Sequence, residues 1–204
     1  MSGQSTLAFL KEKFGRYSFA ALLFLQWEAV LLWLFNRAPG LPGFALRNLV
    51  YRLLFRRLGG FAWVQPGVTF VQTDRLEVGR MAGINTGAYI NAVGGVTLGD
   101  YVLIGSNVTI SSGRHEIDGR LPPIFARPTT PDPIRIEDDV WIGAGAVILP
   151  GVTLRRGSVV GANSVVNRST QEYEVVFGAP ARRIRSRDRS RNGILEHENE
   201  KLER

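Results

Sequence analysis

Apolar side chains recur every six positions through most of the chain. In its second half, two series lie two residues apart: Ile136, Ile142, Ile148, Leu154, Val160 and Val166, with Val140, Ala146, Val152, Ser158 and Ser164. The first half repeats the arrangement: Leu98, Ile104 and Ile110, with Ile84, Ile90, Val96, Val102 and Val108. A period of six fits neither a helix nor a simple alternating strand, but a coil of three flat faces produces it. Residues two apart in a strand point the same way, so both series should face one interior.

Small residues follow the positions of these series, at Gly99, Gly105, Gly143 and Gly161. Glycine adopts positive φ without steric cost, and a tight corner between two flat faces requires such a conformation. We therefore expect these glycines to turn the chain at the corners. The pattern predicts a mainly β solenoid domain over residues 61–170, with a weaker register before Val78.

The six-residue rhythm stops between residues 113 and 133, where five prolines exclude the interior of a regular sheet. It resumes at Ile134. A loop of this length in a compact fold usually has a function. Residues 171–204 form a C-terminal segment in which we expect a strand over 174–177, a turn over 178–180 and a charged tail.

Residues 1–60 do not share the rhythm and predict an apolar, helical segment. Residues 17–35 are almost wholly apolar, with Gln26 and Glu28 near the middle, and a second helix over 44–58 combines an apolar face with a basic rim of Arg47, Arg52, Arg56 and Arg57. Three interpretations remain open. The segment lies on an anionic membrane surface, caps the solenoid and packs in an oligomer, or spans a bilayer. Glu28 argues against a span, because a carboxylate at mid-depth costs about 3 kcal/mol.

Composition narrows the classes of function. The 204 residues include no cysteine, which excludes disulfides, thiolate nucleophiles and cysteine-ligated zinc and suits a reducing, cytoplasmic setting. The net charge of +7 is concentrated in residues 47–57 and 182–191, so we expect no nucleic-acid partner. If the N-terminal segment contacts an anionic membrane, the protein would act at the inner, cytoplasmic face of that membrane.

Four motifs resemble the hexapeptide-repeat acyltransferases, whose fold is a left-handed parallel β-helix. They are VWIGAG at 140–145, PGVT at 150–153, GANSVV at 161–166 and GAPA at 178–181, and the resemblance covers residues 76–185. The motifs look most like those of maltose and galactoside O-acetyltransferases and their polysaccharide-modifying relatives. The resemblance implies a homotrimer that uses acetyl-CoA as acyl donor and a saccharide as acceptor.

His115 is the candidate general base, and the second histidine, His197, lies in the charged tail. Imidazole accepts and returns a proton near neutral pH, as acyl transfer from a thioester to a hydroxyl requires. In the family, a histidine at this place activates the acceptor hydroxyl; a loop histidine exposed by chance is the alternative. Asn85 falls where related enzymes carry an acceptor-binding asparagine, or it is a structural corner residue. Glu116 either polarises His115 or faces solvent.

Several residues are candidates for binding acetyl-CoA. Trp141 matches the family's tryptophan beside the active cleft, although an outward aromatic residue is often part of an interface. The pantetheine arm can pair with a β edge of small residues, and cations can bind the nucleotide phosphates. The candidates are Gly143, Ala144, Gly161 and Ala162 for the edge, with Asn167, Arg168, Arg182, Arg183 and Arg185 at the phosphates. A solvated basic tail is the alternative for the arginines. The resemblance places the donor between adjacent subunits.

We therefore expect an acetyl-CoA-dependent O-acetyltransferase of a sugar hydroxyl. The apolar N-terminal segment is longer than the short helical segment of small sugar acetyltransferases, which favours a glycan or lipid-linked saccharide in polysaccharide biosynthesis. An N-acetyltransferase of an amino sugar and a non-catalytic β-helix scaffold are the alternatives. We expect no metal, because a carbonic anhydrase of this fold needs three histidine ligands and the chain has two histidines.

Overall fold

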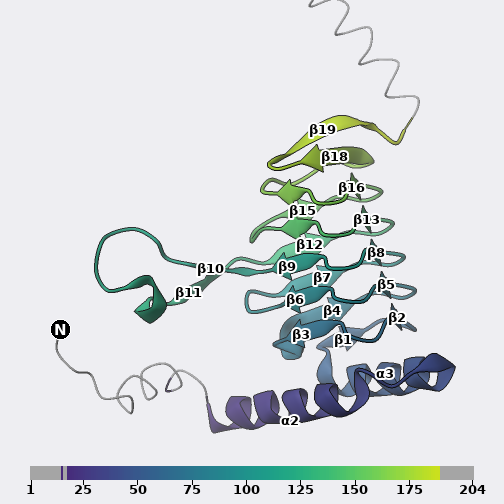
Figure 1. The fold of residues 1–204 in the computed structure, drawn as a ribbon, viewed down its shortest axis with the longest axis vertical. Coiled ribbons are helices and arrows are strands. Elements are labelled where there is room, and N and C mark those ends of the chain that lie inside the picture. Colours follow the sequence, from purple (N-terminus) through teal and green to yellow (C-terminus); the bar gives the residue numbers. More distant parts are fainter. Residues whose placement is uncertain (1–14, 16–17, 189–204) are drawn as a thin grey trace, which may run out of the picture.

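Figure 1 shows the computed structural model, which describes residue 15 and residues 18–188. The strands stack into a prism with three flat sheets. Sheet A contains β1 (Arg57–Leu58), β4 (Leu76–Val78), β7 (Val96–Leu98), β12 (Ile134–Ile136) and β15 (Thr153–Leu154). Sheet B contains β2 (Trp63–Val64), β5 (Gly83–Ile84), β8 (Leu103–Ile104), β13 (Trp141–Ile142), β16 (Val159–Val160), β18 (Glu174–Gly178) and β19 (Ala181–Ser186). Sheet C contains β3 (Thr69–Val71), β6 (Tyr89–Asn91), β9 (Thr109–Ser111), β14 (Val147–Ile148) and β17 (Val165–Val166).

The chain visits sheets A, B and C in turn, and each strand of the regular coils pairs in parallel with the strand one coil away. The two six-residue series line the interior, and every member is at most 2% exposed. Burying each branched side chain contributes about 1.5–3 kcal/mol, so this column of side chains stabilises the fold. The predicted mainly β, parallel solenoid is confirmed.

The sequence pattern assigned two residues of the first half to the wrong series. Ile84 pairs with Ile104 and Ile90 with Ile110, so they belong to the series of Leu98 and not to that of Val96. Five residues, 91–95, separate the interior side chains Ile90 and Val96, against three, 149–151, between Ile148 and Val152, and the two extra residues restart the count of six. Coils of 20 residues in this half, against 18 between Arg135 and Thr153, explain the weak rhythm before Val78.

The glycines after the series are required for a different reason from the one expected. Gly99, Gly105, Gly143 and Gly161 do not have positive φ, which occurs instead at residues such as Asn107, Gly145 and Asn163. A Cβ on Gly143 would lie 2.6 Å from the backbone nitrogen of Ala162 in the next coil. Close stacking of coils, not corner dihedrals, therefore excludes a side chain at Gly99, Gly105 and Gly143, whereas at Gly161 the ring of Phe177 occupies the space.

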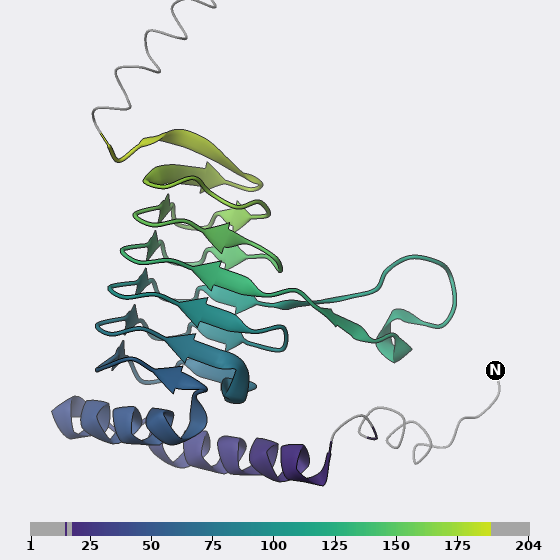
Figure 2. The same cartoon turned by 180° about the vertical axis from the view of Figure 1, so that it is seen from behind.

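Two helices cover the lower end of the prism, α2 (Phe19–Phe35) and α3 (Gly40–Leu54), as Figure 2 shows from behind. Strand β2 has a neighbour on one side only, so its other edge needs partners. Arg47 Nε donates to the Val64 carbonyl at 3.1 Å, and Asn48 bonds both the N–H and the carbonyl of Ala62. Arg47 is 1% exposed, so its expected place in the basic rim was wrong. Within the described residues, no helix has the length and hydropathy needed to cross a bilayer.

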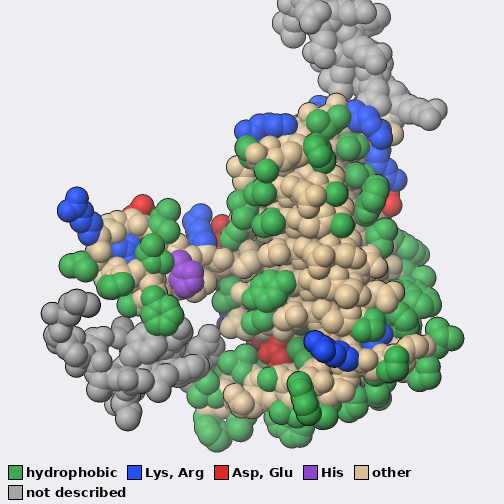
Figure 3. Space-filling model, viewed as in Figure 1, with side chains coloured by type: hydrophobic (Ala, Val, Ile, Leu, Met, Phe, Trp, Pro, Cys, Tyr) green, Lys and Arg blue, Asp and Glu red, His purple; other side chains and the backbone are tan. Residues whose placement is uncertain are grey.

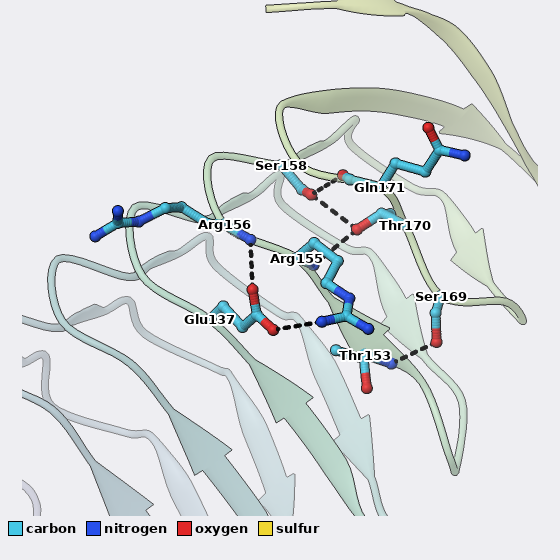
Figure 4. A network of polar contacts seen from close by, with 8 residues as sticks. All are labelled: Glu137, Thr153, Arg155, Arg156, Ser158, Ser169, Thr170 and Gln171. Atoms are coloured by element: carbon cyan, nitrogen blue, oxygen red, sulfur yellow. Dashed lines mark hydrogen bonds and ion pairs between the residues drawn. The ribbon is translucent and has the colours of Figure 1, made fainter.

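Buried serines fix the upper end of the solenoid. Ser158 Oγ lies 2.7 Å from Thr170 Oγ1 and donates to the Gln171 carbonyl, within the network of Figure 4. Ser164 Oγ accepts a hydrogen bond from the N–H of Gly178. The interior series therefore changes from aliphatic residues to serine where the chain leaves the regular coil. Strands β18 and β19 then close sheet B as an antiparallel pair, as the strand and turn predicted for this segment require.

The excursion forms an arm that leaves the prism after β9. Strands β10 (Gly113–His115) and β11 (Thr129–Pro131) pair antiparallel at its base, and a 3₁₀ turn, η2 (Ile124–Ala126), lies near its tip. A second 3₁₀ turn, η1 (Thr73–Arg75), lies between sheets C and A. The arm projects sideways from the prism in Figures 1 and 2, away from the strands of sheet B.

Candidate active site

The corner between sheets B and C, called the BC edge here, carries most of the predicted donor-site residues. Backbone hydrogen bonds stack its coils: Gly105 N–H donates to the Ile142 carbonyl and Gly143 N–H to the Val160 carbonyl, each at 2.8 Å. The edge consists of residues 85–87, 105–107, 143–145 and 161–163. Asn85, Gly143, Ala144, Gly161 and Ala162 therefore lie in one row.

The BC edge presents small side chains to solvent. Ala144 and Ala162 are exposed, and their neighbours Gly143 and Gly161 have no side chain. An extended chain of amides can approach such an edge closely enough to contact its backbone. The arrangement suits the pantetheine arm for which these residues were singled out.

Asn85 has a structural role in this row. Its Nδ2 donates to the Ile104 carbonyl at 2.9 Å, beside the hydrogen bond from its own N–H to the same oxygen. The side chain therefore supports coil stacking, as the structural interpretation of this residue requires. Its Oδ1 accepts no hydrogen bond within the described residues, and the residue is partly exposed.

His115 ends strand β10 at the base of the arm, and its side chain is exposed. The imidazole makes no hydrogen bond or ion pair with another described residue. Glu116 follows it, also exposed, and no contact joins the two side chains in this part of the chain. A polarising role for Glu116 remains a prediction.

Arg127 holds the arm in shape and was missed by the sequence analysis. It is 7% exposed, and its guanidinium donates to the carbonyls of Pro122 at 2.8 Å and Gly119 at 2.6 Å, and also to that of Asp118. Its Nη1 also donates to the Glu116 carbonyl at 3.5 Å, so one planar fork binds four carbonyls of the loop that follows His115. No periodicity surrounds this arginine, so the sequence offered no signal for it.

The corner between sheets C and A, called the CA edge here, carries the base of the arm. The chain leaves the prism there after Ser112 and returns at Asp132, whose N–H donates to the Ser112 carbonyl at 2.8 Å. Asn167 and Arg168 lie on the same edge two coils further on, and both are exposed. Within one chain, sheet C therefore separates His115, Asn167 and Arg168 from the row on the BC edge.

The three arginines of β19 lie at the upper end of sheet B. Arg182 pairs with Phe177, whose ring packs against Gly161, so this arginine lies nearest to the BC edge. Arg183 and Arg185 pair with Val176 and Val175, further from that edge. All three are exposed and, within the described residues, form no ion pair, which leaves their charge available to an anion.

Trp141 points outward from the middle of sheet B and is 51% exposed. It lies between Leu103 and Val159 in the register, and Trp63 is exposed on the same sheet. The corresponding outward positions of sheet A are mostly charged or polar: Arg57, Glu77, Thr97, Arg135 and Thr153. Sheet B is therefore the apolar flank of the prism, beside the BC edge.

Among residues 18–188, no group of three or more His, Cys, Asp or Glu side chains is placed to hold a metal ion. The available chemistry is that of an exposed imidazole, a backbone edge with small side chains, and cations at one end.

Comparison with known proteins gives the same family by three routes. A family model described as the hexapeptide repeat of succinyl-transferase matches residues 133–168. Galactoside O-acetyltransferase of Escherichia coli is 37% identical over 139 residues, which cover 68% of each chain. A putative colanic acid biosynthesis acetyltransferase of the same organism is 28% identical over 79% of this chain and 85% of its own.

The fold matches solved structures. A hexapeptide-repeat acetyltransferase of Vibrio cholerae, solved with acetyl-CoA, superposes with a TM-score of 0.76 at 34% identity, covering 83% of this chain and 90% of the other. The sequence match to the galactoside enzyme and this shared architecture agree with the family indicated by the motifs. The chain belongs to the hexapeptide-repeat acetyltransferases.

Proposed function

We propose that the protein is an acetyl-CoA-dependent O-acetyltransferase that acetylates a hydroxyl group of a saccharide. The observation that carries the proposal is the exposed imidazole of His115 at the base of an arm, on a prism whose BC edge is lined by small residues. The names of the relatives support it, since one acetylates galactosides and another was solved with acetyl-CoA.

In the proposed reaction, His115 removes the proton from the acceptor hydroxyl as its oxygen attacks the thioester carbonyl of acetyl-CoA. A tetrahedral oxyanion forms, which backbone N–H groups near the edge stabilise. The oxyanion collapses, the carbon–sulfur bond breaks, and the imidazolium returns the proton to the thiolate of CoA. The products are an acetyl ester and free CoA. Glu116 would orient the imidazole. Asn85 would accept a hydrogen bond from the acceptor hydroxyl through Oδ1, or donate its second Nδ2–H to the oxyanion.

The donor site would form between two copies of the chain in a homotrimer. His115 lies on the arm at the CA edge, whereas Gly143 and Gly161 lie on the BC edge of the same prism. In a ring of identical subunits, one surface patch of each copy meets a different patch of its neighbour. The arm of one copy can thus meet the BC edge of the next, which would bring Asn167 and Arg168 of one copy towards Arg182 and Trp141 of the other.

The proposed acceptor is a glycan or lipid-linked saccharide of polysaccharide biosynthesis, modified in the cytoplasm. The similarity to the colanic acid biosynthesis acetyltransferase supports this class, because it covers 79% of this chain. The arm supports it too, since an open, laterally projecting loop suits a long acceptor better than a closed pocket would.

A test is the transfer of labelled acetyl groups from acetyl-CoA to extracted glycans by the wild-type protein and by His115→Ala. We expect the variant to lose at least about 100-fold in rate, the usual contribution of a general base. Stabilisation by acetyl-CoA in a thermal melt should persist, since His115 does not hold the donor in this proposal. Arg120→Ala, also on the exposed arm, is the control. Undiminished transfer by His115→Ala, or an amide product that resists mild base, would contradict the proposal.

A further inference from the structure

The lower end of the molecule is an apolar surface formed by α2 and α3. Both helices lie across the end of the prism in Figures 1 and 2, and hydrophobic side chains line the lower margin of the side view in Figure 3. The exposed large apolar residues occur at helical spacing, so each helix contributes one outward face: Phe19, Leu23, Trp27, Val30, Trp33 and Leu34 from α2, and Leu41, Leu49 and Leu53 from α3. We call this surface the end platform.

The charges of the end platform have one sign. Between residues 18 and 73 the sequence contains one carboxylate, Glu28. It is 4% exposed and accepts a hydrogen bond from the N–H of Thr73 at 3.0 Å, so it faces the solenoid. Arg37 and Arg52 are exposed on the helical segment and, within the described residues, form no ion pair. The outward face therefore combines apolar side chains with cations and presents no anion.

We propose that the end platform binds the headgroup region of an anionic phospholipid membrane, with the solenoid pointing away from the bilayer. Apolar side chains would enter the boundary of the acyl chains, and the two arginines would meet lipid phosphates. Trp27 and Trp33, at 63% and 80% exposure, have the amphipathic rings that favour this depth. The helices lie on the membrane and do not cross it, in agreement with their length.

The charge of the end platform favours a membrane over a second copy of the chain as its binding partner. Two end platforms facing each other would place Arg37 and Arg52 of both copies in one contact, with no exposed carboxylate on the helices to pair with them. Such a contact is repulsive, whereas a surface of anionic lipid neutralises both arginines.

The orientation has a consequence for the arm. It leaves the prism after the third strand of sheet C, two strand spacings or about 10 Å beyond the coil on which the helices pack. The helical layer adds about 10 Å, so His115 would stand about 20 Å from the membrane surface, within reach of a saccharide attached to a lipid. The membrane contact itself is independent of the acetyl transfer reaction.

The test is flotation of the full chain with vesicles of phosphatidylcholine and phosphatidylglycerol, compared with phosphatidylcholine alone. We expect binding to the anionic vesicles that falls as salt is raised. Replacing both tryptophans, Trp27→Gln with Trp33→Gln, should weaken binding at least about tenfold, since two large apolar groups are lost. Ile184→Gln removes an exposed apolar side chain at the opposite end of the prism and should bind like the wild type.

A charge variant gives a second measurement that does not alter apolar packing. Arg37→Gln with Arg52→Gln should weaken binding to anionic vesicles several-fold and flatten its salt dependence, whereas Arg120→Gln on the arm should not. Absence of wild-type flotation, or equal losses in the control variants, would overturn the proposal. A particle mass that doubles in the wild type and returns to the single assembly in the tryptophan variant would overturn it in favour of a second copy. Transfer to a soluble saccharide acceptor should be unchanged in both platform variants.

Discussion

Replacing Gly143 with alanine tests the close stacking of coils at the BC edge. The added Cβ would lie 2.6 Å from the nitrogen and 2.9 Å from the Cα of Ala162, both backbone atoms of the next coil. Neither atom can move without shifting a strand, and such overpacking costs about 1–3 kcal/mol. Lower entropy of the unfolded chain offsets about 0.4–1 kcal/mol of this cost. The net loss should be about 1–2 kcal/mol, which lowers the melting temperature by roughly 2–8 °C for a chain of this size.

The assay is thermal unfolding followed by circular dichroism, with Gly83→Ala as the matched control. Gly83 lies in β5 of the same sheet, and its added Cβ would meet Leu103 Cδ1 at 3.0 Å. That methyl group ends a side chain that is 45% exposed and can rotate away. We expect Gly83→Ala to be as stable as the wild type or up to about 1 kcal/mol more stable. Equal melting temperatures for Gly143→Ala and the wild type would refute the stacking argument.

Two further predictions concern single polar residues. Burial raises the pKa of the Glu28 carboxyl, so the folded state holds this proton more tightly than the unfolded state and the carboxylate becomes destabilising as pH rises. Glu28→Gln should therefore be more stable than the wild type at pH 8, by a margin that shrinks as pH falls through the raised pKa; a margin that grows towards low pH would contradict this. Arg127→Ala should loosen the arm and lower the turnover number about 10–100-fold, with unchanged thermal stabilisation by acetyl-CoA. Arg127→Lys should not restore turnover, because an ammonium cannot bind four carbonyls in one plane, and a fully active lysine variant would show that the fork is dispensable.

The repeating part of the fold could be predicted because one physical rule acts on every coil. Each face buries two side chains, so the period of six is visible in the sequence and the interior of the prism follows from it. The same rule misplaced Ile84 and Ile90, since a corner two residues longer shifts the count without changing the chemistry of the core. The sequence could not predict the role of Gly143 either, because the close approach between two coils depends on how they stack and not on the local sequence.

The candidate site was only partly accessible to sequence reasoning. The motifs identified His115 and Gly143 as site residues, but only the topology shows that they lie on different edges of the prism. Arg47 looked like a surface cation because it lies among arginines and leucines, yet its side chain caps the open edge of β2. Arg127 left no trace in the pattern, since its partners are carbonyls of an irregular loop. Contacts with backbone atoms have no sequence signature.

The most direct test of a shared active site is the activity of mixed oligomers. His115→Ala disables the arm, and Ala162→Tyr fills the BC edge at an exposed position where one chain has room for a larger side chain. Each variant alone should be inactive while keeping the wild-type mass. After equal amounts are dissociated and reassembled together, about one quarter of the sites combine an intact arm with an intact edge from the neighbouring copy, so about one quarter of wild-type acetyl transfer should return. Mixed oligomers that stay inactive would contradict the proposal that the arm of one copy serves the edge of the next.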